Sequence, residues 1–539
     1  MFGRVIVSVF SSLNQTSQGR YQTTDSTITG WKQDTLISNQ RIRKRNLSFA
    51  CAKTTVLHHP FSSGVLLMRV PMNSHPSKTQ IKPRYFVLAV VAAGLLLLTQ
   101  GGCDGYQPTR SQSRADVATA IKDWGDPNAM DRQSVIERTM RPYDGASHAG
   151  VDTSTLTGKV MCGYQGWFAA EGDGAARGWT HWEWQNGFQP GSCKIDLWPD
   201  VSEFDPDERY ATPFLHADGR KAEVFSSFNH KTVLRHFQWM EDYGIDGVFV
   251  QRFINQDSST KGLRHMNVVL NHCREGANLH GRAYAVMYDL SGLGGGQMQR
   301  VMDDWKLLVD RMQITKDPAY LHHAGKPLVA VWGFGFNDHR NYTSREGLKL
   351  VDFLKNDPRY GGCTVMLGVP THWRTLDGDC VHEETVHELI LKADIVSPWT
   401  VGRYATSAQA TQYAENIMKP DLQWCQEHGK EFMPVVFPGF SWHNMFPQSP
   451  NNQIPRQKGK FLWTQFLQAK RAGVTMVYQA MFDELDEATA IFKCTDDPPV
   501  GASQFVNYEA LPSDFYLKMV GRASRMMRGQ APVTDKTTD

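Results

Sequence analysis

Four carboxylates stand close together near the C-terminal end of the chain: Asp483, Glu484, Asp486 and Glu487. They directly follow residues 475–481, an apolar run whose β-branched and aromatic side chains predict a buried strand. Two glutamates three positions apart in the turn after a strand can work as a general acid and a general base. Carboxyl pairs of this kind hydrolyse glycosidic bonds. Glu484 and Glu487 are therefore the expected catalytic pair.

The same acids allow two other interpretations. Acidic residues complement the positive end of a helix, and residues 488–492 could continue such a helix. The acids could also hold calcium, although they lack the Asp-x-Asp-x-Asp-Gly spacing of an EF-hand loop. The nine cysteines contain no Cys-x-x-Cys pair of the kind that binds zinc, and the seven after Cys103 leave room for one or two disulfide bonds. We expect no metal ion and no cofactor.

Short β-type runs alternate with helical patterns through most of the chain. The expected strands are residues 160–165, 247–251, 283–289, 328–333, 364–368, 394–398, 432–437 and 475–481. The expected helices are residues 232–243, 297–312, 345–355, 382–392, 408–428 and 460–472. This order predicts the α/β class and a (β/α)8 TIM barrel with long loops on the catalytic rim. An open doubly wound sheet is the alternative, but no Gly-rich nucleotide-binding turn follows the first strand.

In such a barrel, the residues that follow the strands gather at one rim, where active sites of this fold are built. The expected ligand-binding residues are Tyr164, Gln165, Trp167, Gln251, Arg252, Tyr288, Asp289, Trp332, His372, Trp399, Trp442, His443 and Asp483. Aromatic, amide, imidazole and carboxyl groups together suit a neutral polyhydroxylated ligand. His372 and His443 are equally explained as ordinary loop residues, and Arg252 as the partner of a rim carboxylate.

Composition describes an ordinary globular protein with a large core. The chain has 539 residues, of which 41% are hydrophobic and 21% charged, and its formal net charge is +2. Because no long basic run interrupts this balance, nucleic acid is not an expected partner. Several of the 15 tryptophans stand beside Gly, His or Asp in expected loops, where they could stack on sugar rings, while others pack in the core. We expect a monomer that binds an oligosaccharide or polysaccharide.

The N-terminal hundred residues have the pattern of an export signal. Residues 86–98 are an apolar run, too short to span a bilayer comfortably, which follows the basic residues Lys82 and Arg84. Residues 99–103 then resemble a bacterial lipoprotein signal, with Cys103 as the lipidated first residue of the mature chain. Gln100 stands where that signal normally has Leu. We expect a protein of the periplasm or outer envelope that contacts a membrane only through this lipid anchor.

The expected organisation of the chain follows from these features. Residues 1–67 are an extension before the true start or a disordered segment, 68–102 a signal peptide, 103–157 a tether, 158–530 the catalytic barrel and 531–539 a tail. We detect no internal repeat.

Four segments carry a resemblance to a known family. They are Gly-Tyr-Gln-Gly-Trp-Phe at 163–168, residues 243–248, residues 320–329 and Phe-Asp-Glu-Leu-Asp-Glu at 482–487. Together they resemble bacterial proteins described as glycoside hydrolase family 71/99-like, over residues 159–495; some relatives are loosely named xylosidase/arabinosidase. The last segment is similar to the Asn-Glu-Trp-His-Glu catalytic motif of family 99 endo-α-mannosidases. Asp483, Leu485 and Asp486 replace its Asn, Trp and His, and its two glutamates map onto Glu484 and Glu487.

The resemblance to family 99 implies a retaining mechanism with an unusual nucleophile. One carboxylate deprotonates the 2-hydroxyl of the sugar, and that oxygen attacks C1 to give a 1,2-anhydro sugar. By this analogy Glu484 is the base, which needs hydrogen bonds that keep it ionised. Glu487 is the general acid, whose pKa must be raised by an apolar wall or by neighbouring carboxylates.

Attack by the 2-oxygen requires a 2-hydroxyl and a leaving group that are trans, as in α-mannosides, β-xylosides and α-arabinofuranosides. Family 71 enzymes cut α-1,3-glucans with inversion, so an inverting glucanase-like enzyme is one alternative. A surface lipoprotein that binds glycans without cutting them is another.

Overall fold

The computed structural model describes residues 124–537. The expectations for the extension, the signal peptide, Cys103 and the first part of the tether lie outside these residues. No helix within the described range is long and apolar enough to cross a membrane.

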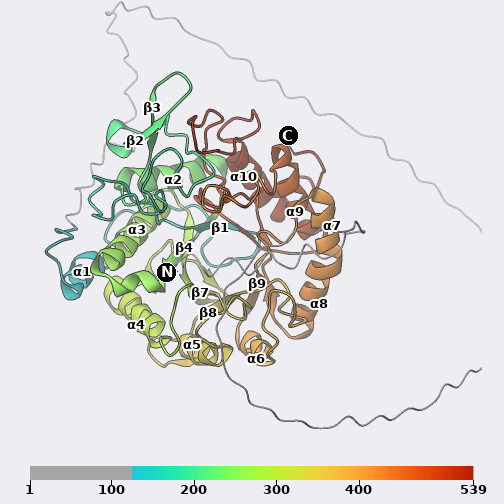
Figure 1. The fold of residues 1–539 in the computed structure, drawn as a ribbon. Helices are drawn as coiled ribbons and strands as arrows, with labels where there is room; N and C mark the ends of the chain where they lie inside the picture. The colour runs from blue at the N-terminus through green and yellow to red at the C-terminus, as the bar shows by residue number, and fades with distance from the viewer. Residues whose placement is uncertain (1–123, 538–539) are drawn as a thin grey trace, which may run out of the picture. The chain divides into compact units, whose positions relative to one another are not determined.

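Parallel strands form a closed barrel, which Figure 1 shows with the helices arranged around it. The strands are β1 (Val160–Tyr164), β4 (Gly247–Phe253), β5 (Ala283–Asp289), β7 (Lys326–Trp332), β8 (Thr364–Val369), β9 (Ile395–Pro398), β10 (Glu431–Phe432), β11 (Val435–Val436) and β12 (Val477–Gln479). They pair in this order, except that β10 and β11 do not pair with each other, and β12 also pairs with β1. Only Met433 and Pro434 separate β10, which pairs with β9, from β11, which pairs with β12. That segment therefore acts as one barrel strand, and the expected (β/α)8 barrel is confirmed.

Helices cover the outside of the barrel. They are α2 (His230–Tyr243), α3 (Thr260–Leu279), α4 (Gln299–Leu307), α5 (Ser344–Asn356), α6 (Thr385–Lys392), α7 (Ser407–Tyr413), α8 (Lys419–Glu427), α9 (Lys460–Arg471) and α10 (Phe515–Met527). A π turn, Ala414–Met418, joins α7 to α8, so the helix expected at 408–428 is nearly continuous. The caps of α2 illustrate how the sequence sets these bounds: the Asn229 side chain accepts from the backbone of Thr232, and Gly244 ends the helix at φ 75°.

The sequence pattern predicts neither α3 nor α10. Every residue from Gly262 to Asn278 in α3 is buried, including Arg264, Asn267 and Asn271. A helix that is buried all round, with polar groups inside, lacks the apolar stripe by which helices are recognised.

The described part of the expected tether packs on the barrel. It contains α1 (Arg132–Thr139), which lies against α3. Asn267 of α3 donates to Thr139 Oγ1 at 2.9 Å, Asn271 donates to the Thr139 carbonyl at 2.6 Å, and Val135 is completely buried. A free tether is therefore wrong for this segment, because its backbone and side chains satisfy buried polar groups of α3.

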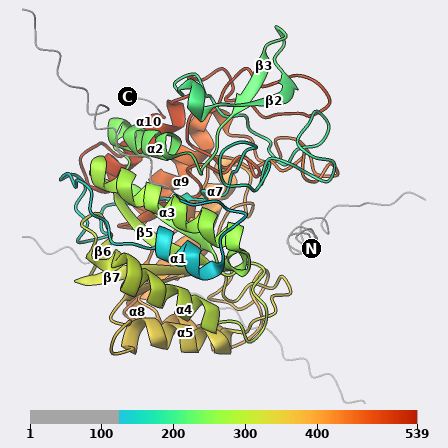
Figure 2. The ribbon, with the colours of Figure 1, turned by 90° about the vertical axis from the view of Figure 1, so that its left-hand side faces the viewer.

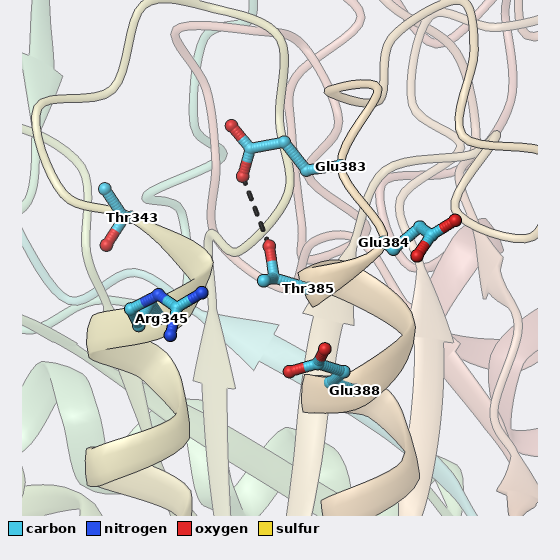
Figure 3. A pocket seen from close by; sticks show the side chains of 6 residues that line it. All are labelled: Thr343, Arg345, Glu383, Glu384, Thr385 and Glu388. Atoms are coloured by element: carbon cyan, nitrogen blue, oxygen red, sulfur yellow. Dashed lines mark hydrogen bonds between the residues drawn. The ribbon is translucent and has the colours of Figure 1, made fainter.

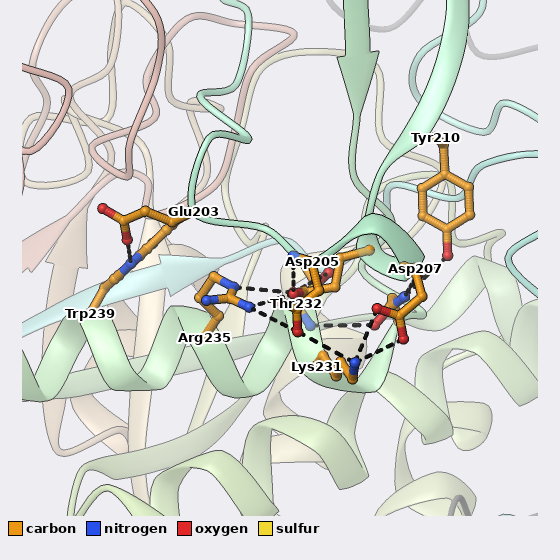
Figure 4. Close-up of polar contacts among 10 residues, drawn as sticks. Glu203, Asp205, Asp207, Tyr210, Lys231, Thr232, Arg235 and Trp239 are labelled. Carbon is orange, nitrogen blue, oxygen red and sulfur yellow. Dashed lines mark hydrogen bonds and ion pairs between the residues drawn. The ribbon is translucent and has the colours of Figure 1, made fainter. Parts of the chain in front are cut away.

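A long connection between β1 and α2 contains the antiparallel hairpin β2 (Tyr210–Leu215) and β3 (Lys221–Val224). In Figure 2 this hairpin projects beyond the helices. Figure 4 shows how the residues before it are fixed on α2. Lys231 lies 2.9 Å from Asp207, and the Trp239 indole donates to Glu203 at 2.8 Å. Residues 203–207 of the connection are therefore anchored on α2.

The seven cysteines in the described chain are buried free thiols. The one or two disulfide bonds that the cysteine count allowed are therefore not formed among residues 124–537.

Candidate active site

The four acids lie in an irregular turn after β12, here called the acidic turn (residues 483–489). No helix starts in this turn or in the residues that follow it to 500. Ala488 has φ 51°, in the left-handed region, and this breaks the helical path. The helix-terminus interpretation of the acids is therefore wrong, and their charges need another explanation.

Asp483 joins the acidic turn to the end of β1. Its carboxylate is fully buried and accepts from the backbone N–H groups of Gln165 at 2.7 Å and Gly166 at 2.9 Å. Burial raises the pKa of Asp483 to about 7, although these two hydrogen bonds act in the opposite direction. Asp483 was expected to bind ligand, but its acceptors face the protein backbone, so it fixes the turn instead.

Glu484 is 4% exposed and accepts two hydrogen bonds from neutral side chains. Gln165 Nε2 donates to Oε1 at 2.7 Å, and Thr489 Oγ1 donates to Oε2 at 2.6 Å. Burial raises the pKa of Glu484, and the charges of Glu487 and Asp486 add to that rise; the two hydrogen bonds oppose it. Both carboxylate oxygens are thus held in fixed positions.

Glu487 differs from Glu484 in its surroundings. It is half-buried, and its carboxylate accepts no hydrogen bond from any residue that the structure describes. Burial, followed by the charge of Asp486, raises the pKa of Glu487 to about 8. Asp486 itself is 4% exposed and lies 3.1 Å from His181 Nδ1. The two glutamates of this turn therefore differ in exposure and in hydrogen-bond partners, and because each is close to the other they titrate as a pair.

Neighbouring loops hold the backbone of the acidic turn. The Asp196 N–H donates to the Leu485 carbonyl at 3.0 Å, and the Ser441 N–H donates to the Glu487 carbonyl at 3.0 Å. The Asp196 carboxylate, fully buried, accepts from the Ser441 hydroxyl and from the His443 N–H at 2.7 Å. These bonds connect both supporting loops to each other, so the turn is fixed from two directions.

A buried arginine supports the other end of the turn. Arg456 donates to the carbonyls of Ala488 at 2.9 Å and Ala490 at 2.6 Å. Its guanidinium lies 4.9 Å from the ring of Tyr508 and 4.6 Å from that of Tyr516. These cation–π contacts stabilise the buried positive charge of Arg456. Arg456 thereby holds the backbone on both sides of Thr489, the residue that donates to Glu484.

Three of the expected ligand-binding residues point away from the barrel mouth. The Tyr164 hydroxyl pairs with His236 Nδ1 at 2.9 Å, and Arg252 and Tyr288 both bond to Asp304, at 2.6 and 2.8 Å. Each of the three stands next in sequence to another residue that was expected to bind the ligand. Successive side chains of a strand point to opposite faces, so both members of such a pair cannot face the barrel interior. Their assignment to the site is therefore wrong, because they face the helix layer.

Their sequence neighbours point into the barrel. Gln251 donates to the Tyr478 hydroxyl at 3.0 Å, and the Trp399 ring lies 6.4 Å from that of Tyr478. The charges of Glu484 and Asp289 both raise the pKa of Tyr478, after burial itself. Tyr478 was not expected in the site; it is the β12 residue that Gln251 and Trp399 contact, and it lies close enough to Glu484 for that charge to affect its pKa.

Several polar atoms near the strand ends are buried without a hydrogen-bond partner in residues 124–537. They include Gln165 Oε1, Trp167 Nε1, Gln251 Oε1, Trp332 Nε1 and Asp486 Oδ1. Buried polar groups are nearly always paired in proteins. Because these atoms follow several different barrel strands, they favour a polar ligand or ordered water at the barrel mouth.

Trp167 was expected to offer a flat face to sugars. Its indole already stacks on His181, with ring centroids 3.9 Å apart and planes 5° apart, and on Phe253 at 5.0 Å and 28°. The group of Trp167 that remains for a ligand is therefore its unpartnered Nε1–H, at the edge of the ring.

The remaining expected residues lie on loops around the rim. The Asp289 carboxylate accepts from the Ser291 N–H at 2.7 Å, and the Trp332 ring lies 4.8 Å from the Arg340 guanidinium. His372 Nδ1 lies 3.0 Å from Asp379, which raises the pKa of His372. No hydrogen bond or ion pair in the described chain joins His372 to the acidic turn.

Trp442 and His443 belong to the loop that supports the acidic turn. Trp442 is 6% exposed and donates from Nε1 to Ser449 Oγ at 2.9 Å, and His443 Nδ1 lies 2.7 Å from the Ser449 carbonyl. Both side chains therefore form hydrogen bonds within their own loop, at Ser449.

A separate hollow of about 550 Å³ lies between the N-terminal ends of α5 and α6 (Figure 3). Its lining residues are Thr343, Arg345, Glu383, Glu384, Thr385 and Glu388. None of them belongs to the acidic turn, so this hollow is not the candidate active site. Among residues 124–537, no group of three or more His, Cys, Asp or Glu side chains is arranged to hold a metal ion.

Comparisons with known proteins give structural matches alone. No family model and no curated protein matches the sequence. A solved GH99 endo-alpha-mannosidase from Bacteroides thetaiotaomicron, in complex with BIS-TRIS-propane, is similar over 70% of this chain and 98% of its own, at 16% identity and a TM-score of 0.50. A second structure of that enzyme matches at 19% identity over 70% of this chain and 99% of its own, with a TM-score of 0.49. The first likeness shows a shared fold.

Proposed function

We propose that this protein is a glycoside hydrolase that acts on a polysaccharide or another glycan. The observation that carries the proposal is the pair Glu484 and Glu487, buried to different degrees in one turn at the carboxyl end of a barrel strand. Active sites of (β/α)8 enzymes are built at this end. A carboxyl pair with unequal surroundings suits the division into acid and base that glycoside hydrolysis requires.

The surroundings of the two glutamates support separate roles. Gln165 and Thr489 donate to Glu484, and these hydrogen bonds favour its ionised form against the rise in its pKa that burial and the neighbouring charges cause, which suits Glu484 to the role of base. Glu487 receives no such bond within the described residues and lies beside the charged Asp486, which favours the protonated form. Glu487 is therefore the general acid.

These roles fit a reaction through the substrate's own 2-hydroxyl. Glu484 removes the 2-hydroxyl proton, O2 attacks C1, the C1–O bond to the leaving group breaks, and Glu487 gives its proton to the departing oxygen. Water, deprotonated by Glu487, then opens the 1,2-anhydro sugar at C1, and Glu484 returns its proton to O2. Two displacements at C1 retain the configuration. The substrates are 1,2-trans glycosides: α-mannosides, β-xylosides or α-arabinofuranosides.

The unpartnered polar atoms at the barrel mouth support a carbohydrate ligand. Gln165 Oε1 and Gln251 Oε1 accept hydrogen bonds, and Trp167 Nε1 and Trp332 Nε1 donate them. Sugar hydroxyls both donate and accept, so one ligand can satisfy all four atoms. Removing such an atom from a folded variant should raise KM.

The test is hydrolysis of matched panels of 1,2-trans and 1,2-cis glycans by the full chain and by Glu487→Gln. Glu383→Gln, a change of the same chemistry at an exposed glutamate in the separate hollow, is the control. The proposal predicts cleavage of trans members alone, lost in Glu487→Gln and kept in Glu383→Gln. Binding of glycans without cleavage would identify a glycan-binding protein instead, and cleavage of α-1,3-glucan with inversion would identify a glucanase-like enzyme.

We infer further that the protein is exported and lipid-anchored at Cys103. The apolar run at 86–98 and the cysteine that follows it support this localisation. Metabolic labelling with a radioactive fatty acid should mark the full chain and should fail to mark Cys103→Ala. Equal labelling of both would contradict the anchor.

A further inference from the structure

His181 lies in the long connection after β1, and its ring is fixed in orientation. Its backbone has φ 67°, a left-handed conformation that is uncommon outside glycine. The imidazole is parallel to the Trp167 indole at 3.9 Å and 5°, and it meets the Phe168 ring edge-on at 6.1 Å and 76°. A residue held in an uncommon backbone conformation and between aromatic rings is a candidate for a functional role.

The fixed ring reaches the acidic turn. His181 Nδ1 lies 3.1 Å from Asp486 Oδ2, so Nδ1 carries the hydrogen that this carboxylate accepts. The other carboxylate oxygen, Asp486 Oδ1, is buried and lacks a partner within residues 124–537. The imidazole thereby fixes the orientation of Asp486.

The imidazole is uncharged near neutral pH. Burial lowers the pKa of His181, and the nearby cations Lys194 and Arg177 lower it further, while Asp486 opposes these effects. A neutral imidazole donates a hydrogen bond without cancelling the charge of its acceptor. Lysine or arginine in the same place would satisfy Asp486 and also neutralise it.

The negative charge of Asp486, which the neutral imidazole does not cancel, acts on the two neighbouring glutamates. Asp486 precedes Glu487, and its charge raises the pKa of both Glu487 and Glu484. The other ionisable group of the turn, Asp483, lies on the β1 side with two backbone donors. Asp486 is thus the charge that acts on both catalytic glutamates.

We propose that His181 is a positioning residue that holds Asp486 as an uncompensated negative charge beside Glu487, so that Glu487 keeps the proton it must donate. The catalytic consequence rests on the proposed hydrolase function. The protonation state of Glu487 does not, because it can be measured without substrate.

Three variants separate the hydrogen bond from the charge. His181→Asn keeps a neutral donor close to the place of Nδ1, His181→Lys introduces a cation, and Asp486→Asn removes the charge while preserving shape. His428→Lys makes the same charge change at an exposed histidine that directly follows α8, and it is the matched control.

The measurement is a carboxyl titration by NMR of the full chain labelled with 13C-glutamate, in which the Glu487 signal is the one absent from Glu487→Gln. We expect the pKa of Glu487 to stay within experimental error in His181→Asn and His428→Lys. In His181→Lys and Asp486→Asn it should fall by about 1 unit or more. The alkaline limb of the kcat profile should move by the same amount.

An unchanged Glu487 pKa in folded Asp486→Asn would overturn the proposal, as would an unchanged value in folded His181→Lys. If His181→Lys does not fold, Asp486→Asn and His181→Asn still decide. If the titrations shift as expected but no glycan is cleaved, the hydrolase proposal fails while the assignment of His181 stands.

Discussion

Gln165 Nε2 donates to Glu484 Oε1 at 2.7 Å, a contact between residues 319 positions apart in the sequence. It joins the end of β1 to the acidic turn after β12, the two neighbouring strands at which the barrel begins and ends. The same glutamine keeps its Oε1 unpartnered, so one side chain orients the proposed base and also offers an acceptor to a ligand.

Substituting either donor to Glu484 should impair the base. In Gln165→Met and in Thr489→Val the carboxylate loses one hydrogen bond, so the pKa of Glu484 rises further and the acidic limb of the kcat profile moves to higher pH. A hydrogen bond to a charged group contributes about 1.5–3 kcal/mol, so kcat should fall about 10- to 100-fold. Steady-state kinetics between pH 4 and pH 9 would measure both effects. An unshifted acidic limb would contradict the role of these donors.

Glu487→Gln should stabilise the protein in a pH-dependent way. The pKa of Glu487 is raised to about 8 in the folded chain, against about 4.3 for an unperturbed glutamate. Between these values the folded state retains a proton that the unfolded state has released, so this group lowers stability as pH rises. Glutamine does not titrate. The Tm of the variant should therefore exceed that of the wild type at pH 8, with the difference shrinking toward pH 4.5. Equal differences at both pH values would count against the raised pKa.

Arg252 and Tyr288 should prove structural. Arg252→Met leaves the buried Asp304 without its cation, a loss of about 3–5 kcal/mol in the free energy of unfolding. Tyr288→Phe removes one hydrogen bond to Asp304 and should cost about 1 kcal/mol, with KM unchanged. Gln251→Met, at the inward-facing neighbour, should raise KM instead. Chemical denaturation and kinetics on the same three variants would distinguish these outcomes, and a raised KM in folded Tyr288→Phe would return that residue to the site.

The segment before β1 should be required for stability. A chain that begins at residue 158 lacks α1 and leaves Asn267 and Asn271 of the buried helix α3 without partners at Thr139. Each unsatisfied buried group costs about 1–3 kcal/mol, so this chain should unfold at a clearly lower Tm than the full protein. Circular dichroism during heating would measure the difference. An unchanged Tm would mean that the segment is a tether after all.

The barrel could be predicted from sequence because buried parallel strands are continuous apolar runs. All eight runs became barrel strands, and the acids after the last run were located correctly at the rim. The direction of single side chains was harder to predict. Tyr164, Arg252 and Tyr288 were assigned to the site because they end strands, but the alternation of a strand turns them toward the helices.

His181 could not be predicted, for a different reason. It lies in a long loop, far in sequence from Asp486, and nothing in its sequence neighbourhood indicates the contact. The fully buried helix α3 escaped notice because its core positions include Arg, His and Asn, and the partners of Asn267 and Asn271 lie far away in sequence, in the segment before β1. Both features depend on tertiary contacts that no local pattern encodes.

The most direct test of the central claim uses a 1,2-trans glycoside that the enzyme cleaves, together with its 2-deoxy analogue. Proton NMR during the first turnovers would identify the anomer released. We predict a product of retained configuration from the parent substrate and no cleavage of the analogue, because Glu484 then has no 2-hydroxyl to deprotonate. An inverted product, or rapid hydrolysis of the 2-deoxy analogue, would contradict the proposed roles of Glu484 and Glu487.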